Sequence, residues 1–308
     1  MAICVTGMHR SGTSMAMSVL NGLGLDVGNE NDLLGASPSN PEGHWENVQC
    51  LDLDDAVLNA LGGGWDCPPD AGSRGFSLDT LAPLKLRARA LRDELGFRAP
   101  WGWKDPRISL LLPFWFDVYP ELKVVVCLRS PLEVAQSLRN RGSSSYRLGL
   151  ALWKTYNERI LVTSRSDQRL ITHYLGYLQH PQIEIERLCS FLGLTPDKDQ
   201  LEESKRRIKS FHRRVTLGMQ EMLDADVPSD IIDLYGRMCR EAGWCEGDES
   251  DGSQDLSISR PARRSGTDQT GGRQRERRPV NSLLLELGFV RRELSTMQRR
   301  ERARASAQ

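Results

Sequence analysis

The residues that point most directly to chemistry lie near the start of the 308-residue chain, in the segment Gly7 to Ser14 (GMHRSGTS). This segment follows a short apolar run, Ala2 to Thr6, and precedes the helical apolar spacing of Ser14 to Leu23. Glycines let a backbone curl so that several N–H groups converge on one anion, and the N-terminus of the next helix adds its dipole. The segment therefore predicts a phosphate-binding loop between the first strand and the first helix.

This loop differs from the loop of magnesium-dependent kinases and NTPases. Those proteins place a lysine directly after the second glycine, where this chain has Thr13, and the nearest cation is Arg10. We find no clear apolar strand that ends in an aspartate and could hold a metal ion, because the run Lys123 to Leu128 ends in Arg129. Arginines in both places favour direct binding of anions without a metal.

A second anion site is predicted where the run Lys123 to Leu128 (KVVVCL) ends, since such a run is typical of a strand buried on both faces of a parallel sheet. Arg129 follows the run, and Ser137 lies further on, in a helix that begins at Pro131. Ligands bind at the carboxyl ends of strands in open α/β sheets, so Arg129 and Ser137 are expected to face one phosphate.

The two motifs together resemble those of sulfotransferases that use 3′-phosphoadenosine 5′-phosphosulfate (PAPS). In that family the loop binds the 5′-phosphosulfate, and the arginine and serine of the second motif bind the 3′-phosphate. Two further segments, Asn40 to Glu46 (NPEGHWE) and Trp101 to Arg107 (WGWKDPR), resemble bacterial members that act on carbohydrate or lipid-linked acceptors. The resemblance spans residues 2 to 215 and implies these donor-binding residues: Arg10, Ser11, Gly12, Thr13, Ser14, Arg129 and Ser137.

The resemblance implies an enzyme that moves a sulfuryl group from PAPS to a hydroxyl or amine of a carbohydrate, lipid-linked or small-molecule acceptor. The product would be adenosine 3′,5′-bisphosphate, and no metal is expected. The chain departs from the family at two places. Many eukaryotic members have Lys-Thr-His with the histidine as base, whereas here Asp105 and Pro106 follow Lys104, and Leu175 follows Tyr174 where relatives often have glutamate.

Transfer to a hydroxyl needs a base that removes its proton. Several relatives use a glutamate shortly after the first helix, and Glu46 is closest to that place. The other candidates are His44, Asp105 and, in the phosphate loop itself, His9. Lys104 is expected to approach the transferring group.

Each of these candidates also has a purely structural interpretation. Glu46 suits the first turn of a helix, Asp105 could pair with Arg107, and Lys104 could be solvated. Aromatic residues near the acceptor-side motifs either stack on a sugar or belong to the core; they are Trp45, Trp65, Trp101, Trp103 and Trp115. The segment Phe211 to Arg214 either closes over the 3′-phosphate or forms a solvated helix face.

Strand patterns that alternate with helix patterns predict an α/β fold, a P-loop-like parallel sheet flanked by helices. Two further strands are expected at Trp101 to Lys104 and at Leu170 to His173. The further helices are expected at Glu46 to Leu61, Leu78 to Leu95, Pro131 to Arg139, Arg147 to Arg165 and Glu184 to Leu192.

The C-terminal region differs in composition from the rest. The chain has a net charge of +0, yet residues 260–308 hold 13 arginines and 5 acidic residues. We expect a sulfotransferase domain over 1–246, a largely disordered linker over 247–279, a basic amphipathic helix over 280–302 and a tail over 303–308. An isolated helix of this length is marginal in water, so we expect it to bind a protein or an anionic membrane rather than nucleic acid.

The seven cysteines include no pair with the two-residue gap of a zinc or redox motif, and no stretch approaches about 20 apolar residues. With no signal-peptide pattern at the N-terminus, these features favour a cytoplasmic protein.

Two other functions stay open at this stage. One is a P-loop nucleotide or nucleoside kinase, and the other is a non-catalytic module whose basic helix binds a partner, a membrane or nucleic acid.

Overall fold

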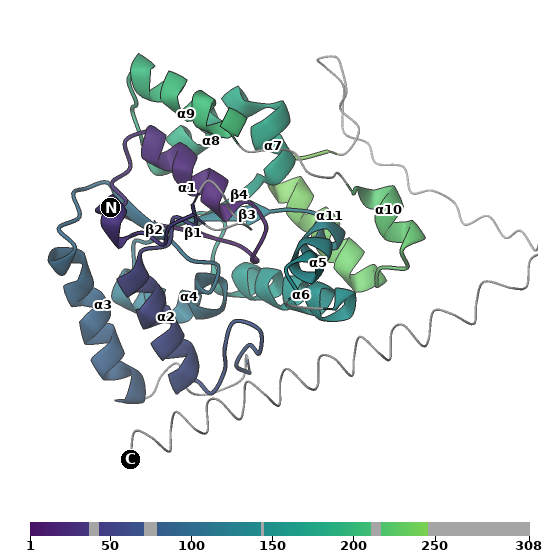
Figure 1. The fold of residues 1–308 in the computed structure, drawn as a ribbon, viewed down its shortest axis with the longest axis horizontal. Helices are drawn as coiled ribbons and strands as arrows, with labels where there is room; N and C mark the ends of the chain where they lie inside the picture. Colours follow the sequence, from purple (N-terminus) through teal and green to yellow (C-terminus); the bar gives the residue numbers. More distant parts are fainter. Residues whose placement is uncertain (37–42, 71–78, 143–144, 211–216, 246–308) are drawn as a thin grey trace, which may run out of the picture. The chain divides into compact units, whose positions relative to one another are not determined.

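A four-stranded parallel sheet in the order β2-β1-β3-β4 lies at the centre of the protein (Figure 1). The structure, a computed structural model, describes residues 1–36, 43–70, 79–142, 145–210 and 217–245. The strands are β1 (Ala2–Thr6), β2 (Trp101–Lys104), β3 (Lys123–Leu128) and β4 (Arg169–His173). The predicted parallel sheet is confirmed, and every strand lies within about one residue of its expected position.

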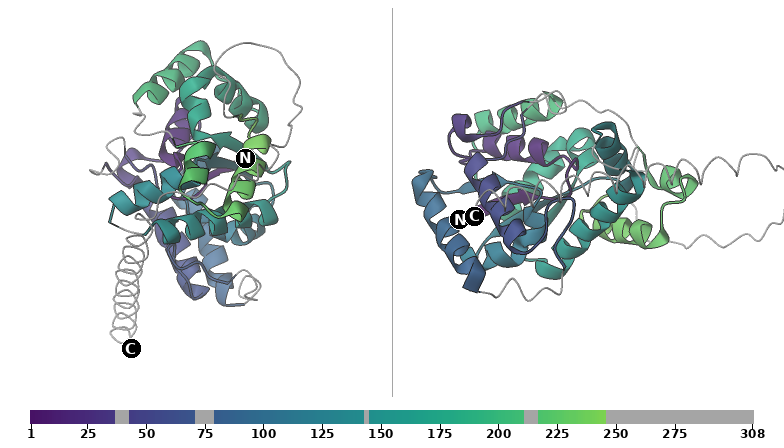
Figure 2. Two further views of the ribbon diagram at one scale, coloured as in Figure 1. Left: turned by 90° about the vertical axis from the view of Figure 1, so that its right-hand side faces the viewer. Right: turned by 60° about the horizontal axis from the view of Figure 1, so that its bottom comes forward.

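Helices cover both faces of this sheet (Figures 1 and 2). The α-helices are α1 (Thr13–Gly22), α2 (Val48–Ala60), α3 (Ala82–Glu94), α4 (Ile108–Val118), α5 (Pro131–Asn140), α6 (Tyr146–Thr163), α7 (Tyr174–Gln179), α8 (Pro181–Leu192), α9 (Lys198–Ser210), α10 (Met219–Asp224) and α11 (Ser229–Glu241). Short 3₁₀ turns lie at η1 (Glu30–Asp32) and η3 (Asp79–Leu81).

Alternate residues of the central strand β1 pack into two separate apolar clusters. Ile3 and Val5 point into a cluster with residues of α1, α7 and α8, while Ala2 and Cys4 point into a larger cluster with residues of α2, α4 and α6. Successive side chains of a strand face opposite sides of the sheet, so a fully apolar strand fits only between two helical layers.

The sequence did not predict α4, which runs from Ile108 to Val118 between β2 and β3. Eight of its 11 residues are buried, and apolar residues lie on nearly every side of the helix, which leaves no amphipathic stripe. It also contains Pro113, a residue that normally indicates the end of a helix. This helix matters for the site because it begins directly after the segment that carries Lys104 and Asp105.

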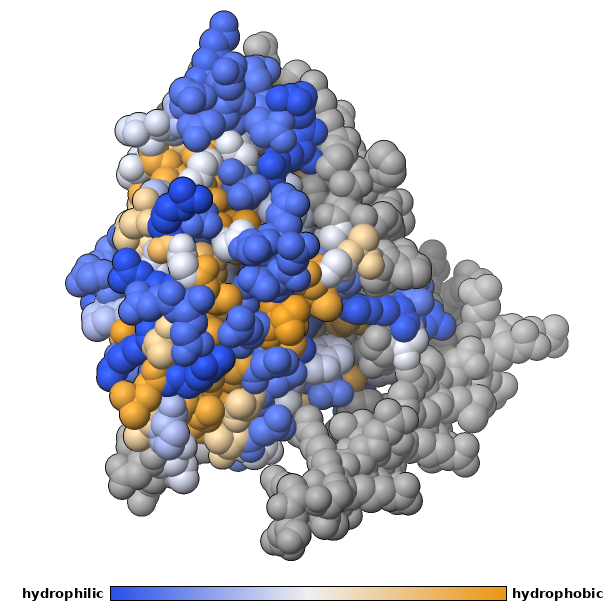
Figure 3. Space-filling model, turned by 60° about the vertical axis from the view of Figure 1, so that its left-hand side comes forward, coloured by the Kyte–Doolittle hydropathy of each residue, from blue (hydrophilic) through white to orange (hydrophobic). Residues whose placement is uncertain are grey.

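Polar and apolar residues alternate over the face formed by α2 and α3, which Figure 3 brings forward. The large apolar side chains that these two helices expose include Val48 of α2 and Leu86 of α3. In the part of the chain that the structure describes, no helix is both long and apolar enough to cross a membrane.

Candidate active site

The predicted phosphate loop lies between β1 and α1, and its backbone depends on two glycines. Gly7 has a φ of 131°, and a Cβ there would stand 2.4 Å from the carbonyl oxygen of Cys127 in β3. Gly12 has a φ of 97°, and its Cβ would stand 2.6 Å from the ring of Tyr174. Only glycine fits both positions, so these residues hold the loop tightly against the ends of β3 and β4.

The loop opens onto the first turn of α1, which starts at Thr13. Among the described residues no side chain caps this turn, and it contains no acidic residue. Ser11 and Thr13 are buried within the loop, and the Ser11 hydroxyl has no hydrogen-bond partner among these residues. A helix N-terminus with these properties favours an anion.

The structure brings the two anion motifs together. The Arg10 Nε donates to the Ser137 hydroxyl at 2.9 Å, and the Arg129 Nη1 donates to the Arg10 carbonyl at 3.2 Å. β3 pairs directly with β1, so its following residue, Arg129, lies beside the loop. Arg10, Ser137 and Arg129 therefore form one cationic group at the carboxyl ends of the strands.

Two residues that the sequence analysis did not select orient Arg129. The ring of Tyr174 lies under the guanidinium, 4.3 Å from its central carbon. Glu133, which is buried in α5, accepts from the Arg129 Nε and also accepts from the Leu217 backbone N–H at 2.8 Å. The sequence carried no signal for this pair, because Arg129 precedes α5 and the helical ion-pair spacing applies only within a helix.

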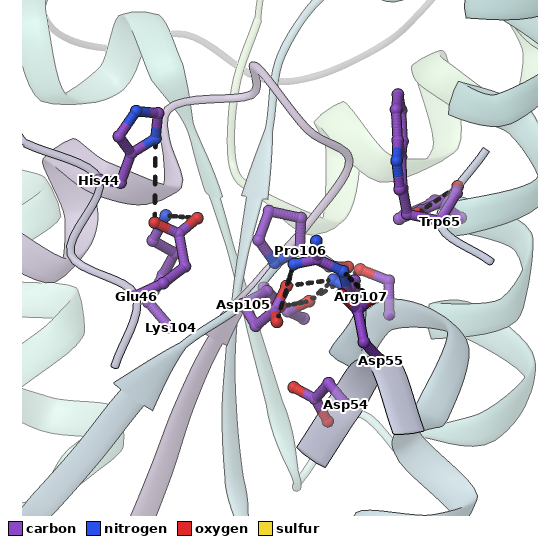
Figure 4. Close-up of polar contacts among 12 residues, drawn as sticks. His44, Glu46, Asp54, Asp55, Trp65, Lys104, Asp105, Pro106 and Arg107 are labelled. Atoms are coloured by element: carbon purple, nitrogen blue, oxygen red, sulfur yellow. Dashed lines mark hydrogen bonds and ion pairs between the residues drawn. The ribbon is translucent and has the colours of Figure 1, made fainter. Parts of the chain in front are cut away.

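A second group of polar residues lies on the β2 side of the loop, and Figure 4 shows His44, Glu46 and Lys104 close together. Lys104 is almost fully buried, and its Nζ donates to the Glu46 Oε1 and lies 3.5 Å from the Ser14 hydroxyl. The Ser14 hydroxyl donates to the His44 carbonyl at 3.1 Å. Lys104 therefore links the acidic candidate Glu46 to the phosphate loop.

Two of the predicted base candidates keep a buried side-chain atom without a hydrogen-bond partner among the described residues, the Oε2 of Glu46 and the Nε2 of His9. The His44 Nδ1 lies 4.0 Å from the Glu46 Oε2. Burial lowers the pKa of His44 below its ordinary value, although the charge of Glu46 opposes this effect. His44 is therefore neutral near pH 7 and leaves the Glu46 carboxylate with one oxygen available for a proton.

Asp105 points away from this group, toward Arg107 (Figure 4). Its carboxylate accepts from the Arg107 backbone N–H at 2.9 Å and from the Arg107 Nη1 at 3.2 Å. Burial raises the pKa of Asp105 to about 6, while Arg107 opposes the shift. The structure thus shows the pairing with Arg107 that the sequence left open as an alternative.

The strand β2 ends at Lys104 beside β1, and Asp105 is the residue that follows it. The Asp105 carboxylate is engaged by Arg107, and among the described residues no group of three His, Cys, Asp or Glu is placed to hold a metal.

His9 lies in the loop with its imidazole against the ring of Trp65, 4.9 Å between centroids, and near that of Tyr156. Burial and several nearby cations, Arg107 first among them, lower its pKa well below the ordinary value. His9 is thus neutral near pH 7. Trp65 belongs to a turn that Tyr156 holds through a 2.7 Å hydrogen bond to the Trp65 carbonyl.

The tryptophans divide between core and site. Trp101, Trp103 and Trp115 are buried in the core, where Trp101 stacks on Trp103 and Trp115 lies tilted against Trp103. Trp45 and Trp65 are half-buried beside His44 and His9. Core packing therefore explains the first group, and only Trp45 and Trp65 stay candidates for contact with an acceptor.

Several predicted features lie outside the described residues. These are Asn40 to Glu42, Phe211 to Arg214, and the C-terminal regions 247–279, 280–302 and 303–308. The division of the chain at residue 246 and the properties of the C-terminal helix stay predictions.

A comparison with curated proteins gave no match. The sulfotransferase domain of the olefin synthase of Synechococcus PCC 7002 is 19% identical, with a TM-score of 0.46, covering 78% of this chain and 94% of that one. A sulfotransferase from Mycobacterium avium is 13% identical, with a TM-score of 0.45, and the match covers 78% of this chain and 76% of that one. A sulfotransferase from Alicyclobacillus acidocaldarius is 16% identical, with a TM-score of 0.41, and the match covers 79% of this chain and 96% of that one.

The family model described as "Sulfotransferase family" matches residues 2–199. This match covers more than half of the chain, including both anion motifs, Glu46 and Lys104. The protein therefore belongs to the sulfotransferase family.

Proposed function

We propose that this protein transfers a sulfuryl group from PAPS to a hydroxyl or amine of a carbohydrate, lipid-linked or small-molecule acceptor. The observation that carries the proposal is the contact of Arg10 with Ser137, which joins the phosphate loop to the second anion motif. PAPS has two separate anionic ends, a 5′-phosphosulfate and a 3′-phosphate. The loop suits the first, and Arg129 with Ser137 suits the second.

Glu46 is the proposed general base. Its Oε2 would take the proton from the acceptor hydroxyl while the acceptor oxygen forms a bond to sulfur and the bond from sulfur to the 5′-phosphate oxygen breaks. Lys104, bound to the other carboxylate oxygen, keeps Glu46 oriented. The leaving group is adenosine 3′,5′-bisphosphate, and Arg10 with the α1 N-terminus would stabilise the charge that develops on its 5′-phosphate.

Calorimetry tests the donor assignment. We expect adenosine 3′,5′-bisphosphate to bind equally well with magnesium and with a chelator. AMP, which lacks the 3′-phosphate, should bind at least about tenfold more weakly, a difference of ~1.4 kcal/mol. Tighter, magnesium-dependent binding of ATP would instead support a nucleotide kinase.

The acceptor follows from a second experiment, incubation with PAPS labelled in its sulfuryl group and a panel of glycans, lipids and phenols. Label on an acceptor supports the proposed transfer, and bisphosphate binding without transfer to any member would favour a non-catalytic module.

We also propose a cytoplasmic location, because the seven cysteines are all unpaired. We further propose that the predicted C-terminal helix binds a protein or an anionic membrane rather than nucleic acid.

A further inference from the structure

A buried group of acidic side chains lies behind Lys104, where α2 packs near the turn between β2 and α4 (Figure 4). Asp54 and Asp105 are both fully buried, with exposed fractions of 0%. Asp55, the next residue of α2, keeps 45% of its side chain exposed. The cation that faces this group is Arg107.

The contacts of Arg107 favour two of the three acids. Asp105 accepts from its backbone N–H and its Nη1, and the Asp55 Oδ1 lies 2.8 Å from its Nε. Asp54 receives only the indole N–H of Trp115, at 2.8 Å on Oδ1. The Asp54 Oδ2 is buried and has no hydrogen-bond donor among the described residues. Asp54 is thus the worst placed of the three to carry a charge.

The carboxyl groups of Asp54 and Asp105 nevertheless lie near each other (Figure 4). Two ionised carboxylates repel each other and only accept hydrogen bonds, so this approach is favourable only with a proton on one of them. Asp55 reaches water and Asp105 has the Arg107 donors, whereas a buried charge without a cation is costly. Of the three acids, Asp54 is therefore the one that can be protonated with the smallest cost in free energy, and its protonation removes the repulsion within the buried group.

We propose that Asp54 is protonated at neutral pH and that its Oδ2 hydroxyl donates to the Asp105 carboxylate, so that Asp54 acts as a positioning residue for the turn after Lys104. The Asp105 carbonyl accepts from the Thr6 hydroxyl at 3.0 Å, at the end of β1. The turn thus connects the base of the phosphate loop to Lys104, whose ammonium holds Glu46.

The titration behaviour agrees with this assignment. Burial and then the charge of Asp105 raise the pKa of Asp54 well above its ordinary value, while the indole hydrogen bond and Arg107 oppose the shift. The other titratable groups that face Asp54 are Cys4 of β1 and Cys50 of α2. Burial raises the pKa of both thiols, so both stay uncharged near pH 7 and neither offsets a charge on Asp54.

Two substitutions locate the proton. In Asp54→Asn the amide nitrogen can donate to Asp105 and the amide oxygen can accept from Trp115, so we expect a thermal midpoint at pH 7 close to that of the wild type. Asp105→Asn removes the anion that accepts from Arg107, and we expect a clearly lower thermal midpoint at pH 7. The reverse order of the two variants would place the proton on Asp105 and overturn the assignment.

The pH dependence of stability gives a second readout. A carboxyl group whose pKa is higher in the folded state stabilises the fold less as pH rises, because the unfolded chain ionises first, near pH 4. The wild type should therefore lose stability as pH rises from about 4 to 7, with a smaller loss in Asp54→Asn. Infrared spectroscopy of the folded wild type should show the carbonyl stretch of a protonated carboxyl group, which is absent from Asp54→Asn. A spectrum without that band would overturn the proposal.

The positioning role rests on the proposed function, so it is tested by turnover with PAPS. Asp54→Asn should keep turnover within about twofold, and Asp54→Ala or the milder Asp54→Ser should lower kcat by about tenfold or more without changing bisphosphate affinity. Unchanged kcat in either folded variant would overturn that role. Failure of the proposed function would appear differently, as a wild type that transfers no sulfuryl group while the stability and infrared results still hold.

Discussion

Glu46 is the residue whose surroundings best suit proton transfer. It is buried beside the phosphate loop, one of its carboxylate oxygens is held by Lys104, and the other has no hydrogen-bond partner among the described residues. Asp105, the other acidic candidate, is engaged by Arg107. At the scale of single residues the geometry therefore favours Glu46 as the base.

Replacing Glu46 by Gln should lower kcat by about 10²- to 10⁴-fold, because the amide cannot take a proton. Bisphosphate affinity should change little, since Glu46 does not belong to either anion motif. Steady-state kinetics together with calorimetry would measure both effects. If turnover is unchanged, the base is another group, and the His44→Gln variant is the next to measure.

Arg129→Lys should weaken binding of adenosine 3′,5′-bisphosphate by about tenfold, because a lysine cannot replace a fixed guanidinium at a phosphate. AMP should bind the variant and the wild type alike. Arg187→Lys is a matched control, since Arg187 pairs with Glu184 in α8, away from the anion motifs. An equal loss for AMP and the bisphosphate would contradict the assignment of Arg129 to the 3′-phosphate.

At the scale of elements, the phosphate loop depends on contacts with β3 and α7 as much as on its own sequence. Gly7 lies against the backbone of Cys127, and Gly12 lies against the side chain of Tyr174, which also stacks on Arg129. A change at Gly12 therefore affects the loop and the second anion motif together.

Gly12→Ala should lower both the thermal midpoint and the bisphosphate affinity, because its Cβ meets the Tyr174 ring at 2.6 Å. Gly193→Ala is the matched control: it also has a positive φ, of 63°, but its Cβ has no atom within 4 Å among the described residues. Gly193→Ala should lose only about 1 kcal/mol of stability, from its backbone conformation, and should bind the bisphosphate as tightly as the wild type. Equal affinity of both variants would show that the Tyr174 contact is unimportant.

His173 joins β4 to α11 through its Nε2, 3.0 Å from the Tyr235 hydroxyl. Burial lowers the pKa of His173 to about 3. Below about pH 6.5 the unfolded chain takes up a proton that the folded protein does not, so this residue makes the fold less stable as pH falls. Urea unfolding should show that the free energy of unfolding falls less between pH 7 and pH 5 in His173→Gln than in the wild type. An equal fall in both proteins would mean that other groups dominate the pH dependence.

At the scale of the whole molecule, the sheet and its two helical layers account for every residue assigned to donor binding, all of which precede Pro181. The predicted division at residue 246 rests on composition alone. None of the residues assigned to donor binding belongs to the basic region after it.

A truncated protein of residues 1–246 should fold and bind adenosine 3′,5′-bisphosphate with an affinity within about twofold of that of the full chain. Calorimetry measures the affinity, and circular dichroism confirms that the fragment folds. Loss of binding by a folded fragment would show that residues 247–308 contribute to the site and that the predicted boundary is wrong.

The sequence by itself determined the local features of this protein. Apolar patterning located the four strands and six of the 11 α-helices described by the structure, because apolar spacing reflects which faces a segment buries. The motifs around Arg10 and Arg129 indicated anion binding, because glycine spacing and arginine chemistry are local properties. Helix α4 escaped this reasoning, since a segment buried on nearly every side has no periodic signal.

Tertiary structure alone decided how the candidates divide into roles. The resemblance put Glu46 before Asp105 as a base, but the sequence could not show the partner of each acid, because most of these partners lie far apart in the chain. The fold places Lys104 on Glu46, Arg107 on Asp105 and the indole N–H of Trp115 on Asp54. Burial and charge pairing depend on contacts between distant segments, and these contacts separate the proposed base from the acids that hold the turn beside it.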